Sequence, residues 1–158
     1  MIKTVLAVAL LALGACTSTP PTTEPSQTPP APPATDSAGV SCDDAPEDVV
    51  GTALRLRLGR VSQTITGNVV RCAYDGGTAE VRFETGADAA SFAEGRADHA
   101  GATDLPGFHD EAYRATAVTG EVVRTAVVAR AGTVEITVLS GARTEHAQQL
   151  VTELFARL

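Results

Sequence analysis

The sequence predicts an α+β domain in which an antiparallel sheet of five to six strands is covered by about three helices. Two observations support this prediction. Several short segments alternate apolar and polar residues with a period of two, and turn residues separate them. The C-terminal segment instead spaces its apolar side chains as one face of a helix does, at Ala147, Leu150, Val151, Leu154, Phe155 and Leu158. The expected order is helix, two strands, helix, three strands and helix, which suggests a two-layer or a sandwich arrangement.

The N-terminus has the features of a bacterial lipoprotein signal peptide. Residues 1–3 carry one positive charge, and the run 5–13 is apolar. The run is too short to span a membrane as a helix. Two small residues then precede Cys16, as in a lipobox, so we expect residues 1–15 to be removed and Cys16 to carry the lipid. Two acyl chains give stable anchoring. The alternative is an ordinary secretory signal with a chance cysteine.

Residues 16–41 are expected to form a lipid-anchored, disordered tether. Seven of the nine prolines lie here, with threonine and serine between them and almost no large apolar side chain. Such a segment cannot bury enough surface to offset its ordering entropy. Fully extended at ~3.1 Å per residue, it reaches roughly 75 Å from the membrane. A bare spacer and an O-glycosylated stalk both fit this composition, and we favour the spacer.

Composition excludes several classes of partner and cofactor. Without residues 1–15 the chain has eleven arginines and nineteen acids, a formal net charge of −8. Nucleic acid is therefore not an expected partner, because it requires a basic surface. The sequence contains no glycine-rich phosphate loop and no nucleophile elbow. We accordingly assign no cofactor, no metal and no catalytic residue.

Residues 42–158 are expected to form a single extracytoplasmic domain. Asp44 and Glu47 have the spacing of a capping box and open the first helix, which Gly59 ends. Its apolar stripe is Val50, Leu54 and Leu58.

The later elements follow in chain order. Residues 61–68 are ambiguous, with a short edge strand as one interpretation. A second helix is expected at 87–97 and a third after Thr144. The expected strands are 69–74, 79–83, 113–118, 121–130 and 133–139.

Cys42 and Cys72 remain as a pair once Cys16 is assigned to lipid. An exported protein rarely keeps an odd free thiol, so we expect a disulfide. It would join the start of the first helix to the first firm strand, and loop closure of this length is worth ~3–4 kcal/mol. Metal binding is the alternative use of these two thiols. It requires a third and a fourth ligand, and no histidine has a suitable spacing.

The segment 101–113 is the expected location of any ligand or catalytic site. His109, Asp110 and Glu111 form the densest ionisable cluster that contains a histidine, and Tyr113 follows closely. A histidine beside carboxylates can work as an acid–base pair or bind a cation. Neighbours in an extended chain point to opposite sides, however, so the three do not easily converge on one atom. The interpretation that we favour is structural, with Asp110 bonding the turn and the others solvated.

The lipobox at Cys16, the Pro/Thr tether, the Cys42 and Cys72 pair and the segment 107–113 together resemble a known group. This group comprises small exported lipoproteins of actinobacteria that carry one domain of unknown function. Its last segment often reads Gly-Leu-Gly-Asp-Glu-Ala-Tyr, and this chain departs from that pattern at Phe108 and His109. The resemblance implies envelope localisation and the lipid anchor, and it assigns no catalytic residue.

Two function classes follow from these observations. The first is a non-catalytic module, anchored in the cell membrane, that binds a small molecule or a protein in the envelope. The second is a hydrolase-like envelope enzyme with its site near residues 101–113. A cavity lined by convergent ionisable groups would favour the enzyme, whereas an apolar lining would favour the binding module.

Overall fold

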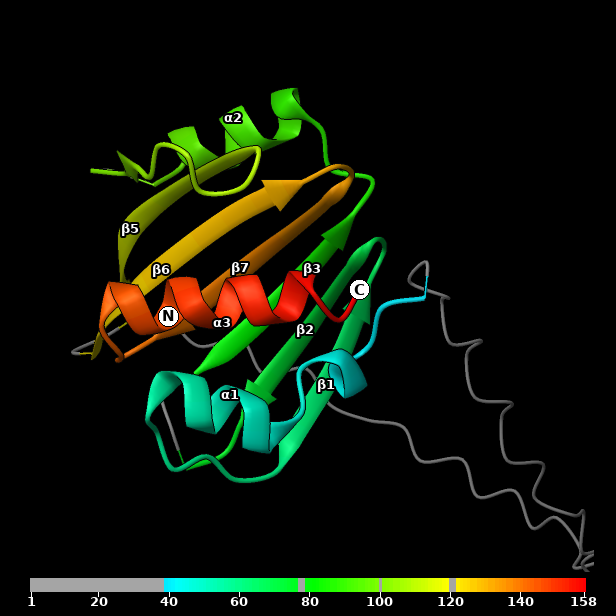
Figure 1. The fold of residues 1–158 in the computed structure, drawn as a ribbon, viewed down its shortest axis with the longest axis vertical. Helices are drawn as coiled ribbons and strands as arrows, with labels where there is room; N and C mark the ends of the chain where they lie inside the picture. Colours follow the sequence, from blue (N-terminus) through cyan, green and yellow to red (C-terminus); the bar gives the residue numbers. More distant parts are fainter. Residues whose placement is uncertain (1–38, 77–78, 100, 120–121) are drawn as a thin grey trace, which may run out of the picture. The chain divides into compact units, whose positions relative to one another are not determined.

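The computed structural model describes residues 39–76, 79–99, 101–119 and 122–158. The expected signal peptide, Cys16 and most of the expected tether lie outside these described residues. The fold is α+β, as predicted, with an antiparallel sheet and three α-helices. The sheet has seven strands instead of five to six, in the order β1-β2-β3-β7-β6-β5-β4 (Figure 1).

The elements have the following bounds. A short 3₁₀ turn, η1, spans Cys42–Asp44, and the helices are α1 (Glu47–Leu54), α2 (Ala89–Ala97) and α3 (Thr144–Phe155). The strands are β1 (Val61–Thr66), β2 (Val69–Tyr74), β3 (Glu80–Thr85), β4 (Thr103–Asp104), β5 (Glu111–Thr119), β6 (Val122–Ala131) and β7 (Val134–Ser140).

Two strands account for the error in the predicted number and order. β1 is a full six-residue strand, although its polar sequence gave no clear alternation. It pairs with β2 along its whole length through a two-residue hairpin turn. β4 has only two residues and pairs with β5 through Thr103 and Asp104. A strand of that length has no periodicity for a sequence to display.

The first helix is shorter than predicted. Asp44 does take part in a capping box, but with Ser41 and around η1. The α-helix starts only after Pro46 and ends at Leu54, because Arg55 adopts a left-handed conformation with φ 56°. Leu58 packs against the core from the connection beyond the helix.

One face of the sheet carries the main core. Helices α1 and α3 lie across this first face and contact one another, and α3 also contacts β6 and β7 (Figure 1). The predicted stripe of α3 is buried at four positions, while Phe155 is only partly buried and Leu158 is exposed. The fully buried side chains of this core include Val50, Leu54, Val70, Phe83, Ile136, Val138, Leu150 and Leu154.

Helix α2 covers part of the second face, where it packs over β5 and β6. Phe92 of α2 contacts a small separate cluster formed by Tyr113, Ala115, Ala126 and Val128. These strand residues alternate with Ala112, Val127 and Ala129, which belong to the main core. Since successive strand residues point to opposite faces, α2 lies on the other side of the sheet from α3.

A disulfide joins Cys42 to Cys72, with their Cα atoms 5.6 Å apart. It ties η1 to β2 from the first face. Nearby, the buried Tyr74 hydroxyl donates a hydrogen bond to the carbonyl of Ala45. The start of the folded chain is therefore held against the sheet at two points.

Candidate functional site

A cavity of about 290 Å³ lies between α2 and the connection from β4 to β5. We call it the α2 cavity. Its apolar lining comes from Phe92, Ala93, Leu105, Pro106, Phe108 and Ala112, and its polar lining from Arg96, Asp104, Asp110 and Glu111. The segment that the sequence singled out thus borders a hollow on the second face.

The β4–β5 connection is a tight, internally bonded loop. Leu105 N donates to Ala112 O at 2.9 Å, and Phe108 N donates to Leu105 O at 3.2 Å. Gly107 then has φ 77° and His109 has φ 57°, both in the left-handed region. That conformation costs little for glycine and more for histidine, so the contacts of the histidine must stabilise it.

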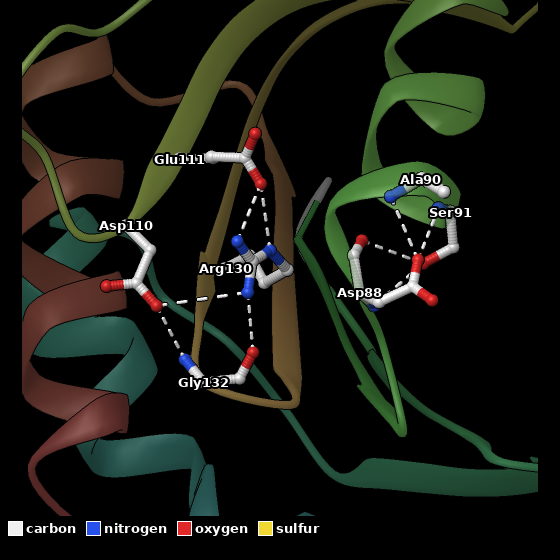
Figure 2. A network of polar contacts seen from close by, with 7 residues as sticks. All are labelled: Asp88, Ala90, Ser91, Asp110, Glu111, Arg130 and Gly132. Atoms are coloured by element: carbon white, nitrogen blue, oxygen red, sulfur yellow. Dashed lines mark hydrogen bonds and ion pairs between the residues drawn. The ribbon is translucent and has the colours of Figure 1, made fainter.

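Arg130 holds the end of this loop (Figure 2). Its Nε and Nη2 atoms donate to Oε2 of Glu111 at 2.9 and 2.7 Å, and its Nη1 donates to Gly132 O at 2.6 Å. Asp110 accepts from Gly132 N at 2.8 Å and lies 3.8 Å from Arg130 Nη1. We call Arg130, Glu111, Asp110 and Gly132 the Arg130 clamp. It binds the loop to the turn between β6 and β7.

His109 lies against the other side of the sheet. Its ring centroid is 4.5 Å from that of Phe108 and 4.4 Å from that of Phe155 in α3. Burial lowers the pKa of His109, and the neighbouring Asp110 carboxylate partly opposes that shift. Its Nε2 atom is buried and has no hydrogen-bond partner among the described residues. The neutral imidazole therefore works as a packing group between the loop and α3.

Tyr113 is the strand residue on which Phe92 of α2 packs. It is 2% exposed, and its ring packs edge-to-face on Phe92 with centroids 5.3 Å apart. The ring centroid of His99 lies 5.8 Å from that of Tyr113. Burial raises the pKa of Tyr113 to about 12. The hydroxyl accordingly stays protonated at neutral pH.

The start of α2 is fixed beside the same clamp. Oδ1 of Asp88 accepts from Ala90 N at 2.9 Å and from Ser91 N at 2.8 Å, which caps the helix (Figure 2). These backbone hydrogen bonds, that from Ser91 first, hold the pKa of Asp88 below its usual value. Ala87 N also donates to Thr133 O at 3.0 Å. Both walls of the α2 cavity therefore attach to the β6–β7 turn.

The charged groups that line the α2 cavity are already paired with protein groups. Arg96 of α2 donates to Asp104 of β4 at 2.7 Å, across the cavity. Asp110 and Glu111 are bound within the Arg130 clamp. The accessible surface of the cavity is mostly apolar, and Phe92 and Phe108 contribute to it.

The structure brings Asp110 and Glu111 together at the α2 cavity and separates them from His109 and Tyr113. Asp110 bonds the β6–β7 turn, as the structural interpretation supposed, but His109 is packed and Glu111 is ion-paired instead of solvated. Sequence reasoning missed Arg130. The strand register is the signal that finds it: Thr119 pairs with Val122, and counting back along both strands from this pair places Arg130 opposite Glu111.

Glu135 is a second group that sequence reasoning missed. Burial, followed by repulsion from Glu84, raises its pKa to about 7. Glu84 lies directly opposite it in the β3–β7 ladder. Arg82, Thr137 and Arg130 oppose the shift. A carboxyl that is half-protonated near neutral pH therefore lies on the second face.

No helix within the described ranges is both long enough and apolar enough to cross a membrane. Among the same residues, no group of three or more histidine, cysteine, aspartate or glutamate side chains is arranged to hold a metal ion. Comparisons with known proteins were equally without result. No protein-family model, no curated protein and no solved structure matches this chain.

Proposed function

We propose that this chain is a lipid-anchored protein of the cell envelope whose folded domain binds a small, neutral, largely apolar molecule in the α2 cavity. The anchor is Cys16, on the extracytoplasmic face of the cell membrane, and the residues from 17 to 38 are the tether; Val40 and Ser41, which were expected to belong to it, are part of the fold. One observation carries the binding proposal: a largely apolar hollow whose charged lining residues are already paired with protein groups.

The size and the lining of the α2 cavity support a small, neutral, largely apolar ligand. Its volume of about 290 Å³ is at the lower end of the range for small-molecule pockets. Phe92 and Phe108 provide aromatic surface for a flat or branched apolar body. Arg96 and Asp104 already form an ion pair, so the lining attracts a charged ligand less than an unpaired charge would.

The positions of the ionisable residues favour binding over catalysis. A general base requires a tuned pKa and a reachable proton. His109 is packed against Phe155, and its pKa is lowered by burial on the opposite side of the sheet. The Glu111 carboxylate accepts a hydrogen bond from Arg130, and the Asp110 carboxylate accepts one from Gly132 N. These three residues therefore support the wall of the cavity instead of acting within it.

Fluorescence of 1-aminoanthracene, a neutral apolar probe, tests the proposal on the purified chain. We expect saturable enhancement that Ala93→Trp abolishes, because Ala93 lines the cavity and is exposed enough for a larger side chain to fill it without disturbing the core. Ala97→Trp, on the same helix but outside the lining, is the matched control and should bind as the wild type does. Equal enhancement in both variants would place the probe elsewhere and contradict the proposal.

A further inference from the structure

Among the residues that the structure describes, strand β1 forms one edge of the sheet and pairs on one side alone, with β2. Just before the strand, Asp75 N donates to Arg60 O at 3.0 Å. Hydrogen-bonded partners alternate along an antiparallel pair, so every second residue after Arg60 also bonds to β2. The backbone groups of the intervening residues, Val61, Gln63 and Ile65, therefore point away from the sheet.

These three residues present three N–H and three C=O groups in the pattern that an added strand requires. Within the described ranges no backbone group bonds to them. Natural edge strands are usually protected by lysine, proline, a bulge or very short length. The sequence of β1, Val-Ser-Gln-Thr-Ile-Thr, has six uncharged residues, none of them proline. By contrast, the opposite edge, β4, has two residues, one of which is the charged Asp104.

An acidic turn borders this edge on the first face. Cys42 N donates to the side-chain Oε1 of Gln63 at 2.7 Å, which holds η1 beside β1 (Figure 1, cyan). The disulfide between Cys42 and Cys72 fixes the same turn to β2. Four acids lie at 43, 44, 47 and 48, and no basic residue lies between Ser41 and Leu54.

We propose that the β1 edge takes up an extended segment of another protein, with a basic residue at its centre. The segment pairs through its backbone with Val61, Gln63 and Ile65, as in other cases of strand addition. Its central side chain lies opposite Gln63, on the face that carries η1, and is attracted by Asp43. Apolar side chains two positions to either side contact the half-buried Val61 and Ile65. A second copy of this chain fits less well, because self-pairing centred on Gln63 would bring two acidic turns together.

The test uses the full-length chain and a fluorescein-labelled peptide, Thr-Val-Thr-Lys-Thr-Val-Thr. Its valines and lysine share one face, and their N–H groups are the ones that bond to β1. Anisotropy should show saturable binding, and hydrogen exchange should slow at the amides of Val61, Gln63 and Ile65 but not at Ser62 or Thr64. Methylating the lysine nitrogen of the peptide backbone should weaken binding by about tenfold or more, since it removes a donor and adds a clash. Methylating the following threonine, whose N–H faces away from β1, is the matched control and should have little effect.

Charge is tested separately. Replacing the central lysine of the peptide with glutamate should weaken binding, and Asp43→Asn should reduce the difference between the two peptides. Asp98→Asn, at an exposed acid that follows the end of α2, should leave the difference unchanged. Absence of peptide binding, or protection at other amides, would overturn the proposal. Protection of the same three amides without peptide, accompanied by dimerisation in sedimentation, would overturn it in favour of a second copy.

Discussion

Arg130 and Glu111 are direct partners across the β5–β6 ladder, and two nitrogens of the arginine donate to one oxygen of the glutamate. The arginine side chain is only 14% exposed, so water screens this pair less than a surface pair. Because Arg130 also bonds Gly132, it links the loop that walls the α2 cavity to the β6–β7 turn.

Arg130→Gln should destabilise the domain by about 1–2 kcal/mol, since it leaves two carboxylates without their cation. We expect a lower urea midpoint with an unchanged slope, together with weaker binding of 1-aminoanthracene as the wall loosens. Arg57→Gln, an exposed arginine outside the clamp, should change stability by less than about 0.5 kcal/mol. Equal effects of the two changes would show that the clamp has no structural role.

Glu135 should make stability depend on pH. Its pKa is about 7 in the folded protein and near 4.5 in the unfolded chain, so the folded state favours the protonated form. Its stabilising contribution is thus fully present below pH 4.5 and is lost as the pH rises through 7. Between pH 5 and pH 8 the free energy of unfolding should fall by on the order of 2 kcal/mol. Urea unfolding of the wild type and of Glu135→Gln at pH 5 and pH 8 measures it.

In that experiment Glu135→Gln should gain stability relative to the wild type at pH 8 and little at pH 5. Glu94→Gln, an exposed acid on α2, is the control and should show no such difference. If Glu135→Gln is no more stable at pH 8 than the wild type, Glu135 is not the origin of the dependence.

Much of the fold could be predicted because local patterns determine it. The stripe of α3 and the alternation in β2, β3 and β7 follow directly from burial of one face. β1 and β4 were harder to predict, because their pairing depends on the neighbouring strands β2 and β5 and not on their own periodicity. The early end of α1 depends on one residue, Arg55, in a left-handed conformation that its residue type does not signal.

The location of the candidate site could be predicted, but the roles of its residues could not. Loop 101–113 does border a cavity. Whether His109 points into that cavity depends on its left-handed backbone and on Phe155, which is far away in the sequence. Predicting the Arg130 clamp requires the strand register. Predicting that Glu135 is half-buried requires the packing of the second face. These are tertiary properties, which no short motif encodes.

Reduction of the Cys42–Cys72 disulfide should lower stability by about 3–4 kcal/mol, because the bond restricts the unfolded chain. Chemical denaturation with and without a reducing agent measures the loss. The double variant Cys42→Ser, Cys72→Ser should match the reduced wild type and no longer respond to the reductant. Unchanged stability on complete reduction would mean that the other contacts of η1 suffice to hold it.

Cys16→Ala should prevent membrane anchoring. In a bacterial host we expect the wild type in the membrane fraction, with a mass increase from acylation, and the variant unprocessed or released. Thr17→Ala, which keeps the cysteine, is the matched control. A cleaved and acylated Cys16→Ala protein in the membrane fraction would contradict the lipobox interpretation.

The most direct test of the binding proposal is an NMR titration of the chain with 1-aminoanthracene, followed at assigned backbone amides. Shifts should concentrate at the lining of the α2 cavity, at Ala93, Gly107, Phe108 and Ala112, and should saturate together. In Ala93→Trp they should disappear, while Ala97→Trp should retain them. If the shifts fall instead on the exposed strand surface around Thr64 and Arg82, or if no amide responds, the α2 cavity is not a ligand site and the proposed function is wrong.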